Sequence, residues 1–142
     1  MSDTVSNAAT GSRAWTIALW CAQVALAVLF GMAGAMHTFV SPDALAGMGA
    51  AWAQAVPIAL VRFVGLCELA GAIGIVLPAA TRIKPSLTPL AALGFTAIQC
   101  LAIPLHIMRG EIAHTAGANI LLLALSLFVL WGRTRKAPVQ PR

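Results

Sequence analysis

Four long apolar runs dominate the pattern of hydrophobic and polar positions, at residues 15–35, 58–77, 89–108 and 115–131. Each approaches the roughly 20 apolar residues that a helix needs to cross the hydrocarbon core of a bilayer. The pattern predicts an all-α membrane protein, a four-transmembrane-helix bundle that occupies residues 15–132. The polar residues 1–14 and the basic residues 133–142 are expected to form flexible tails.

Prolines mark the ends of these runs. The second run is entered through Pro57 and left through Pro78, positions where a missing backbone N–H disturbs a helix little. Thr88 and Pro89 fit the N-cap and the first residue of the third helix. Pro104, inside that helix, predicts a kink because a proline cannot donate to the helical hydrogen-bond ladder.

A short interfacial helix is predicted between the first two spans. Ser41, Pro42 and Asp43 fit an N-cap, a first helical residue and an acidic first turn. An apolar stripe at helical spacing follows, formed by Leu45, Met48, Trp52 and Val56. Such a stripe favours a helix that lies on the membrane interface, with a plain loop as the alternative.

Composition supports a membrane protein. The 142 residues are 60% hydrophobic and 9% charged, whereas soluble domains are about 45–50% apolar and about 25% charged. The net charge of +5 could suggest a nucleic acid partner, but that needs a basic face on a folded domain. Here the basic residues flank the apolar runs, so the expected partner is the lipid bilayer and not nucleic acid.

The basic residues also predict an orientation. In a chain with four spans both termini lie on one side, and that side holds seven of the nine Lys and Arg residues: Arg13, Arg82, Lys84, Arg133, Arg135, Lys136 and Arg142. Arg62 and Arg109 belong to the opposite side. Because cytoplasmic loops are rich in Lys and Arg, we expect a multi-pass protein of the inner (plasma) membrane with both termini in the cytoplasm.

Polar residues inside the spans are candidates for function, because lipid offers them no partner. Glu68 lies near the middle of the second run, and Gln23 and Gln99 are expected at a similar depth in the first and third. We expect the two amides to hydrogen-bond a neutral Glu68 carboxyl in one shared layer. Glu68 then holds the helices together, handles protons, or pairs with Arg62 for structure alone. Arg62 is expected to reach toward the outer surface.

A second polar layer is predicted at the outer ends of the helices. It comprises His37, Arg62, His106 and Asn119, with Arg109, Glu111 and His114 in the adjoining loop. Histidines beside an arginine and an acid suit an anion, a polar headgroup or a quinone carbonyl, and equally suit plain contact with solvent. The candidate site is therefore His37, Arg62, Glu68 and His106, supported by Gln23, Gln99, Arg109 and Asn119. No catalytic residue is assigned.

Metal and thiol chemistry find no support in the pattern. There is no His-x-x-x-His or Glu-x-x-His pair of the kind that binds metals on a helix. Cys21, Cys67 and Cys100 fall on three different helices with no Cys-x-x-Cys, and we expect them to be inert core residues. We expect no metal site, and no cofactor motif is evident.

Four stretches carry a family resemblance: WCAQVALAVLF at residues 20–30, RFVGLCELAGAIGIVLP at 62–78, TPLAALG at 88–94 and HIMRGE at 106–111. Together they make residues 15–133 resemble the DoxX-like membrane proteins, most specifically in the second stretch. The resemblance implies a four-helix integral membrane bundle. It also implies a link to thiosulfate:quinone oxidoreductase and to membrane partners of redox enzymes, with quinone as the candidate cofactor. Family members often carry Lys where this chain has His37.

Three functions stay open. The first is a non-catalytic membrane subunit or scaffold of a redox or stress-response system, packed through small-residue faces at Gly31, Gly34, Gly71 and Gly74. The second is a quinone-linked oxidoreductase component in which Glu68 relays protons. The third is a small transporter or channel, which would have to assemble as a homo-oligomer because one four-helix unit lacks inverted repeats. The expected protein partners are a soluble or membrane redox enzyme and further copies of the chain.

Overall fold

The computed structural model describes the backbone of residues 2–142 and the side chains of residues 13–142. Four long helices make up most of it: α1 (Ser2–Phe39), α3 (Ile58–Thr81), α4 (Leu87–Met108) and α5 (Ile112–Trp131). The shorter elements are α2 (Pro42–Gly47), the 3-10 turn η1 (Ala51–Gln54) and the π-helical turn η2 (Gly132–Lys136). No strand occurs within residues 2–142, so the all-α prediction is confirmed.

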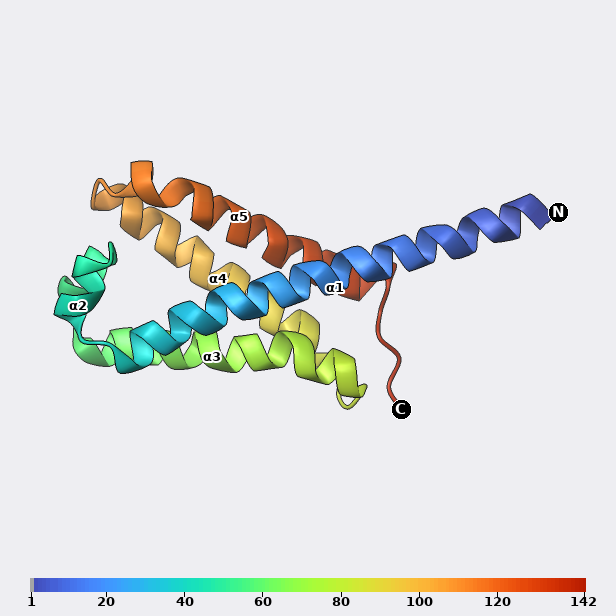
Figure 1. The fold of residues 1–142 in the computed structure, drawn as a ribbon, viewed down its shortest axis with the longest axis horizontal. Coiled ribbons are helices and arrows are strands. Elements are labelled where there is room, and N and C mark those ends of the chain that lie inside the picture. Colours follow the sequence, from blue (N-terminus) through green and yellow to red (C-terminus); the bar gives the residue numbers. More distant parts are fainter. Residues whose placement is uncertain (1) are drawn as a thin grey trace.

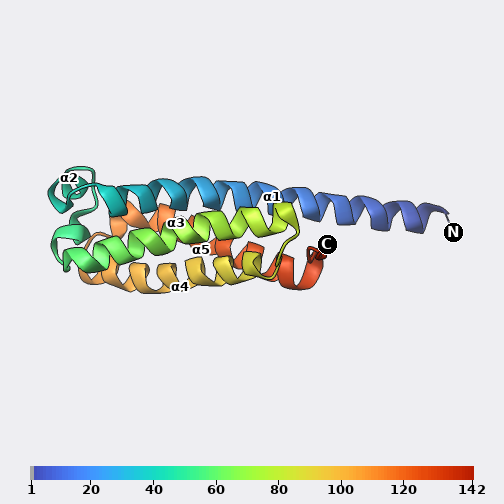
Figure 2. The same ribbon diagram turned by 90° about the horizontal axis from the view of Figure 1, so that it is seen from below.

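The long helices run antiparallel in sequence order and form one elongated bundle (Figure 1). α1 packs mainly against α3, and α4 packs against both α3 and α5. The first turns of α1 project beyond the other helices, on the side where the C-terminus also lies (Figure 2). We call that side the basic end (residues 82–86 and 132–142) and the opposite side the α2 end (residues 40–57 and 109–111).

Most of the apolar surface of the bundle faces outward. Four segments are long and apolar enough to cross a membrane, Arg13–Phe39, Ile58–Thr81, Leu87–Met108 and Ile112–Lys136, and at most 33% of the apolar window in any of them is buried within the chain. Monomeric proteins that are soluble in water rarely expose this much apolar surface. Contact with lipid explains it, as expected for a transmembrane bundle.

The helix bounds differ from the prediction in all four long helices. α4 begins at Leu87 with Ser86 as its N-cap, so the N-cap predicted at Thr88 is wrong, and α5 begins at Ile112.

α3 continues through Pro78 and ends at Thr81. Arg82, the C-cap residue that follows, takes a left-handed φ of 61°. Pro78 lies in the last turn and is buried, where its missing N–H removes a single hydrogen bond while packing holds the turn together. α1 is helical from Ser2, well before the expected start at Trp15, because nothing in residues 2–14 forces a break.

The interfacial helix exists but is shorter than the stripe predicted. Ser41 caps α2, its hydroxyl accepting from the Ala44 N–H at 3.3 Å, and Pro42 is the first helical residue. Gly49, at φ 97°, then turns the chain, so the apolar stripe divides between α2 and η1. Leu45 is buried in a small cluster with Ala53 and Val61, which fastens the α2 end to α3.

Two glycines allow α1 and α3 to approach closely. A Cβ on Gly34 would lie 2.8 Å from the Gly65 carbonyl oxygen, and a Cβ on Gly65 would lie 2.8 Å from the Thr38 nitrogen. Gly71 likewise faces the ring of Phe95 inside the bundle. The small-residue faces that the sequence offered to a partner protein are therefore used within the chain.

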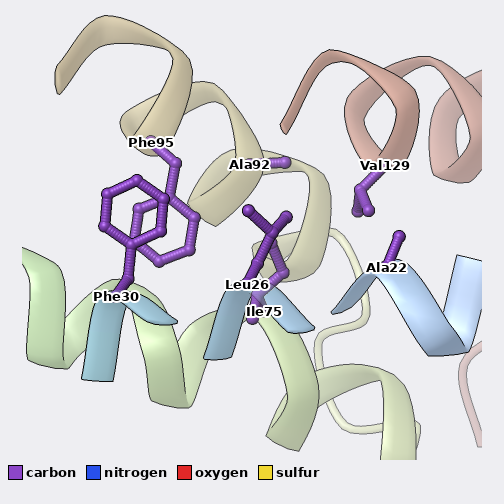
Figure 3. Close-up of a cluster of buried hydrophobic side chains, with 7 residues drawn as sticks. All are labelled: Ala22, Leu26, Phe30, Ile75, Ala92, Phe95 and Val129. Carbon is purple, nitrogen blue, oxygen red and sulfur yellow. The ribbon is translucent and has the colours of Figure 1, made fainter. Parts of the chain in front are cut away.

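The apolar core lies between the basic end and the point where Gly34 and Gly65 bring α1 and α3 together. Phe30 of α1 stacks on Phe95 of α4 with ring centroids 3.8 Å apart and planes inclined by 5°. The remaining buried members of this cluster extend along the bundle axis from the stacked rings (Figure 3): Ala22, Leu26, Ile75, Ala92 and Val129. This core joins all four long helices and sets the register in which their polar residues meet.

Substitution Gly34→Ala tests the contact between α1 and α3. The added methyl group would overlap backbone atoms of α3 that cannot move independently, so we expect a loss of about 1–3 kcal/mol in the free energy of unfolding. Unfolding of the purified protein in mixed micelles measures it. Gly117→Ala is the matched control, since a Cβ there meets no atom within 4 Å. Equal stability of the two variants would contradict the contact.

Candidate functional site

The candidate site is organised around a buried pair, His37 and Glu68. The Nδ1 atom of His37, in the last turn of α1, lies 2.6 Å from Oε2 of Glu68, near the middle of α3. The side chains are 14% and 6% exposed. The Trp52 ring packs against the imidazole in a T-shaped arrangement, with ring centroids 5.1 Å apart. Gly34, one turn before His37, brings the helices close enough for the pair to form.

The chemistry of this pair follows from its burial. A lone carboxylate in an apolar interior is costly, and a protonated partner removes that cost. A carboxylate beside a neutral imidazole carries one negative charge. One added proton, on either side chain, makes the pair neutral. Loss of that proton would leave one uncompensated negative charge inside the bundle. The geometry therefore places one hydrogen-bonding proton between the two side chains.

Arg62 fixes the helix end that carries His37. Its Nη1 donates to the carbonyl oxygens of His37 and Val40, each at 2.7 Å. Carbonyls at a helix C-terminus have no partner within the helix and attract a cation. The sequence predicts an arginine that reaches toward the outer ends of the helices, and its side chain binds the end of α1, which lies at the α2 end. No ion pair between Arg62 and Glu68 occurs among the described side chains.

His106 belongs to a separate cluster in the turn between α4 and α5. Its Nδ1 lies 3.0 Å from Oε2 of Glu111, and Arg109 Nε donates to Oε1 of the same carboxylate at 2.8 Å. Gly110, at φ 70°, makes the turn that folds Glu111 back onto both. The single outer layer predicted from the sequence is thus divided into two clusters. Glu111, which seemed peripheral in the sequence, is the centre of the second one.

The hydrogen bond from His106 dominates the electrostatics of this turn. Together with Arg109 it stabilises the carboxylate form and lowers the pKa of Glu111 below its usual 4.5. His106 lies five residues before this glutamate and Arg109 two residues before it. Gly110 lies between Arg109 and Glu111. That spacing around a glycine is a signal from which the cluster could have been predicted.

The shared layer of Gln23, Gln99 and Glu68 does not form. Gln23 donates to the Ile75 carbonyl and accepts from Arg133 Nε at 2.6 Å, at the basic end of the bundle. Gln99 and Asn119 are buried, and Oε1 of Gln99 and Nδ2 of Asn119 have no hydrogen-bond partner. The predicted depth of Gln23 in the membrane assumes a first helix that starts at Trp15. The register actually depends on the contact of Gly34 with α3, which places Gln23 near Ile75.

The burial of Arg133 is the feature that is hardest to predict from the sequence. It directly follows α5 in a run of basic residues and was assigned to a flexible tail, yet it is only 5% exposed. Its one detectable signal is that the apolar run before it, residues 115–131, is short for a span. Extending the span into the basic run, as Ile112–Lys136 does, would have placed Arg133 inside the bundle.

The cysteines do not lie in the core as expected. Cys21 and Cys100 are exposed on the outer surface of the bundle, and Cys67 is half-buried; all three are free. Helix surfaces that face lipid are apolar, so a thiol is tolerated there as a small apolar group. Among the described residues, no group of three or more His, Cys, Asp or Glu side chains could hold a metal ion.

Comparison with known proteins identifies a family. Residues 21–129 match the DoxX-like family, which confirms the resemblance and covers all four long helices. No curated protein and no solved structure matches the chain.

Acidification tests the Glu111 cluster. A carboxyl whose pKa is lowered on folding stabilises the fold fully above its unfolded pKa, and this contribution is lost as the pH falls through the folded value. We therefore expect Glu111→Gln to be less stable than the parent at neutral pH, and the difference to shrink below pH 4.5. Thermal unfolding in detergent at neutral and acid pH measures it. A difference that stays constant with pH would refute the assignment.

Proposed function

The chain belongs to the DoxX-like family, and on that basis we propose that it is the membrane subunit of a redox assembly. In this proposal the His37–Glu68 pair takes up and releases protons that accompany reduction of a membrane quinone. The observation that carries the proposal is the 2.6 Å contact between Nδ1 of His37 and Oε2 of Glu68, buried between α1 and α3.

The position of the pair suits proton delivery. His37 lies in the last turn of α1, close to the α2 end, where loops meet water, and Glu68 lies deeper along α3. A proton that enters at the imidazole can pass to the carboxyl over one short hydrogen bond. Arg62 keeps the end of α1, and with it His37, at this distance. General acid–base groups act only when they are held within hydrogen-bond reach in this way.

Electrons are the part of the reaction that this pair does not handle. Reduction of a quinone to a quinol consumes two electrons and two protons, and the electrons would come from a partner redox enzyme. The protein's part in such a reaction is to position groups and to manage protons. A small subunit that supplies a proton site to a larger assembly fits both the family link and the pair.

We further propose an orientation for this subunit. Seven of the nine Lys and Arg residues lie at or beyond the basic end, which by the positive-inside rule faces the cytoplasm. The protein then lies in the plasma membrane with both termini inside. The His37–Glu68 pair would then lie nearer the extracytoplasmic side, from which it would draw protons.

Substitution Glu68→Gln tests the proposal, because glutamine keeps the shape of the side chain but carries no exchangeable acid proton. We compare membranes from a deletion strain that makes the parent, Glu68→Gln or Glu111→Gln, and measure reduction of an added soluble quinone with endogenous electron donors. The parent should raise the rate above that of the deletion strain. Glu68→Gln should reduce this increment by at least about tenfold, whereas Glu111→Gln, altered in a different cluster, should keep it.

Affinity purification in mild detergent separates the two parts of the proposal. The parent and Glu68→Gln should retain the same redox enzyme, since the substitution leaves the outer surface of the bundle unchanged. A full quinone-reduction rate in Glu68→Gln with the partner still bound would show that the chain only anchors its partner. A parent that retains no redox enzyme would contradict the membrane-subunit role itself.

A further inference from the structure

A buried arginine at the basic end has one unused donor group. Arg133 is 5% exposed. Its Nε donates to Gln23 Oε1 at 2.6 Å, its Nη1 donates to the Ala137 carbonyl at 3.2 Å, and its guanidinium lies 5.4 Å from the centre of the Trp20 ring. The third nitrogen, Nη2, is buried without a hydrogen-bond partner. The side chain is therefore held in place from three directions while part of its fork stays unsatisfied.

No acidic side chain among residues 13–142 pairs with that arginine. Of the four Asp and Glu residues in the sequence, Asp43 and Glu111 belong to the α2 end, and Glu68 pairs with His37 on the same side of the core. Asp3 is joined to Gln23 by continuous helix, which at 1.5 Å per residue separates them by about 30 Å. A guanidinium is always charged, and burying it without a counter-ion is unfavourable.

A cavity of about 500 Å³ lies beside Arg133, between the α3–α4 turn and the C-terminal tail. Lys84 and Ser86 line it from the turn, and Pro138 and Pro141 line it from the tail. The tail is fastened there because Arg82 Nε donates to the Gln140 carbonyl at 2.9 Å. Among the described side chains no carboxylate lines this cavity. Its polar wall consists of two cations and one hydroxyl.

That wall matches the chemistry of a phosphate group. Phosphate oxygens accept charge-assisted hydrogen bonds from an arginine fork and from an ammonium, the strong combinations in proteins. Ser86 is the N-cap of α4, and its side chain makes no cap hydrogen bond, so its hydroxyl is free to donate. The positive N-terminal end of α4 adds to the attraction for an anion.

We propose that this cavity binds a phosphate-bearing anion, held by Arg133 and Lys84. Arg133 belongs to the membrane-spanning segment Ile112–Lys136, close to its end, where lipid headgroups lie. An anionic phospholipid and free inorganic phosphate share the required chemistry and are the two sources to distinguish. The site lies at the end of the bundle opposite His37 and Glu68, so it is independent of the proposed proton exchange.

The variants for the test remove one positive charge each. Lys84→Gln alters an exposed residue that makes no ion pair among the described side chains, so it should fold normally. Arg133→Gln removes the central donor but also leaves Gln23 without its partner, and its folding has to be checked by circular dichroism. Arg135→Gln is the matched control, since Arg135 lies in the same turn, is exposed and does not line the cavity.

Isothermal titration calorimetry in a maltoside detergent, which contains no phosphate, measures binding of lysophosphatidylglycerol and, separately, of inorganic phosphate. We expect the parent and Arg135→Gln to bind with equal affinity, Lys84→Gln to bind about tenfold more weakly, and Arg133→Gln not to bind. Binding of the lysolipid alone identifies a lipid headgroup site, and binding of inorganic phosphate as well identifies a site for the free ion. The proposal is overturned if neither probe binds the parent, or if Lys84→Gln and Arg135→Gln bind alike.

Discussion

The close contact of α1 with α3 at Gly34 and Gly65 is the constraint on which the rest of the structure depends. Lipid provides no hydrophobic force to drive two helices together, so membrane helices associate by packing and by interhelical hydrogen bonds. With no Cβ on either glycine, the α1 and α3 backbones approach until Gly34 meets the Gly65 carbonyl. Once this point is fixed, His37 lies opposite Glu68, and Gln23 lies opposite Ile75.

The register that follows distributes the polar groups between two ends of one apolar core. Near the α2 end, the His37 and Glu68 side chains hydrogen-bond each other, and Arg62 donates to the carbonyl oxygens at the end of α1. At the basic end, Gln23 joins α1, α3 and Arg133 through two hydrogen bonds. The stacked rings of Phe30 and Phe95 lie between these ends. The apolar core thereby separates the His37–Glu68 pair from the basic end.

The sequence predicts the spans, the start of the interfacial helix and the family, because each depends on local pattern. Apolar runs identify helices that face lipid, and Ser41 with Pro42 identifies a helix start wherever it occurs. Contacts between helices depend on register, and hydropathy contains no information about register. The sequence therefore places Glu68 and His37 in one candidate site but not in direct contact, and it assigns Gln23 to the wrong layer. Arg133 was missed because a basic run after a span usually lies in water.

Infrared difference spectroscopy of the assembly purified with its partner, reconstituted in liposomes with quinone, tests the central claim most directly. The reduced-minus-oxidised spectrum reports which carboxyl groups change protonation or hydrogen bonding when the quinone is reduced. We expect a carboxyl band that is absent in Glu68→Gln and displaced in His37→Gln, because in our proposal the proton is held between these two side chains. A difference spectrum that is the same in the parent and in Glu68→Gln would contradict it.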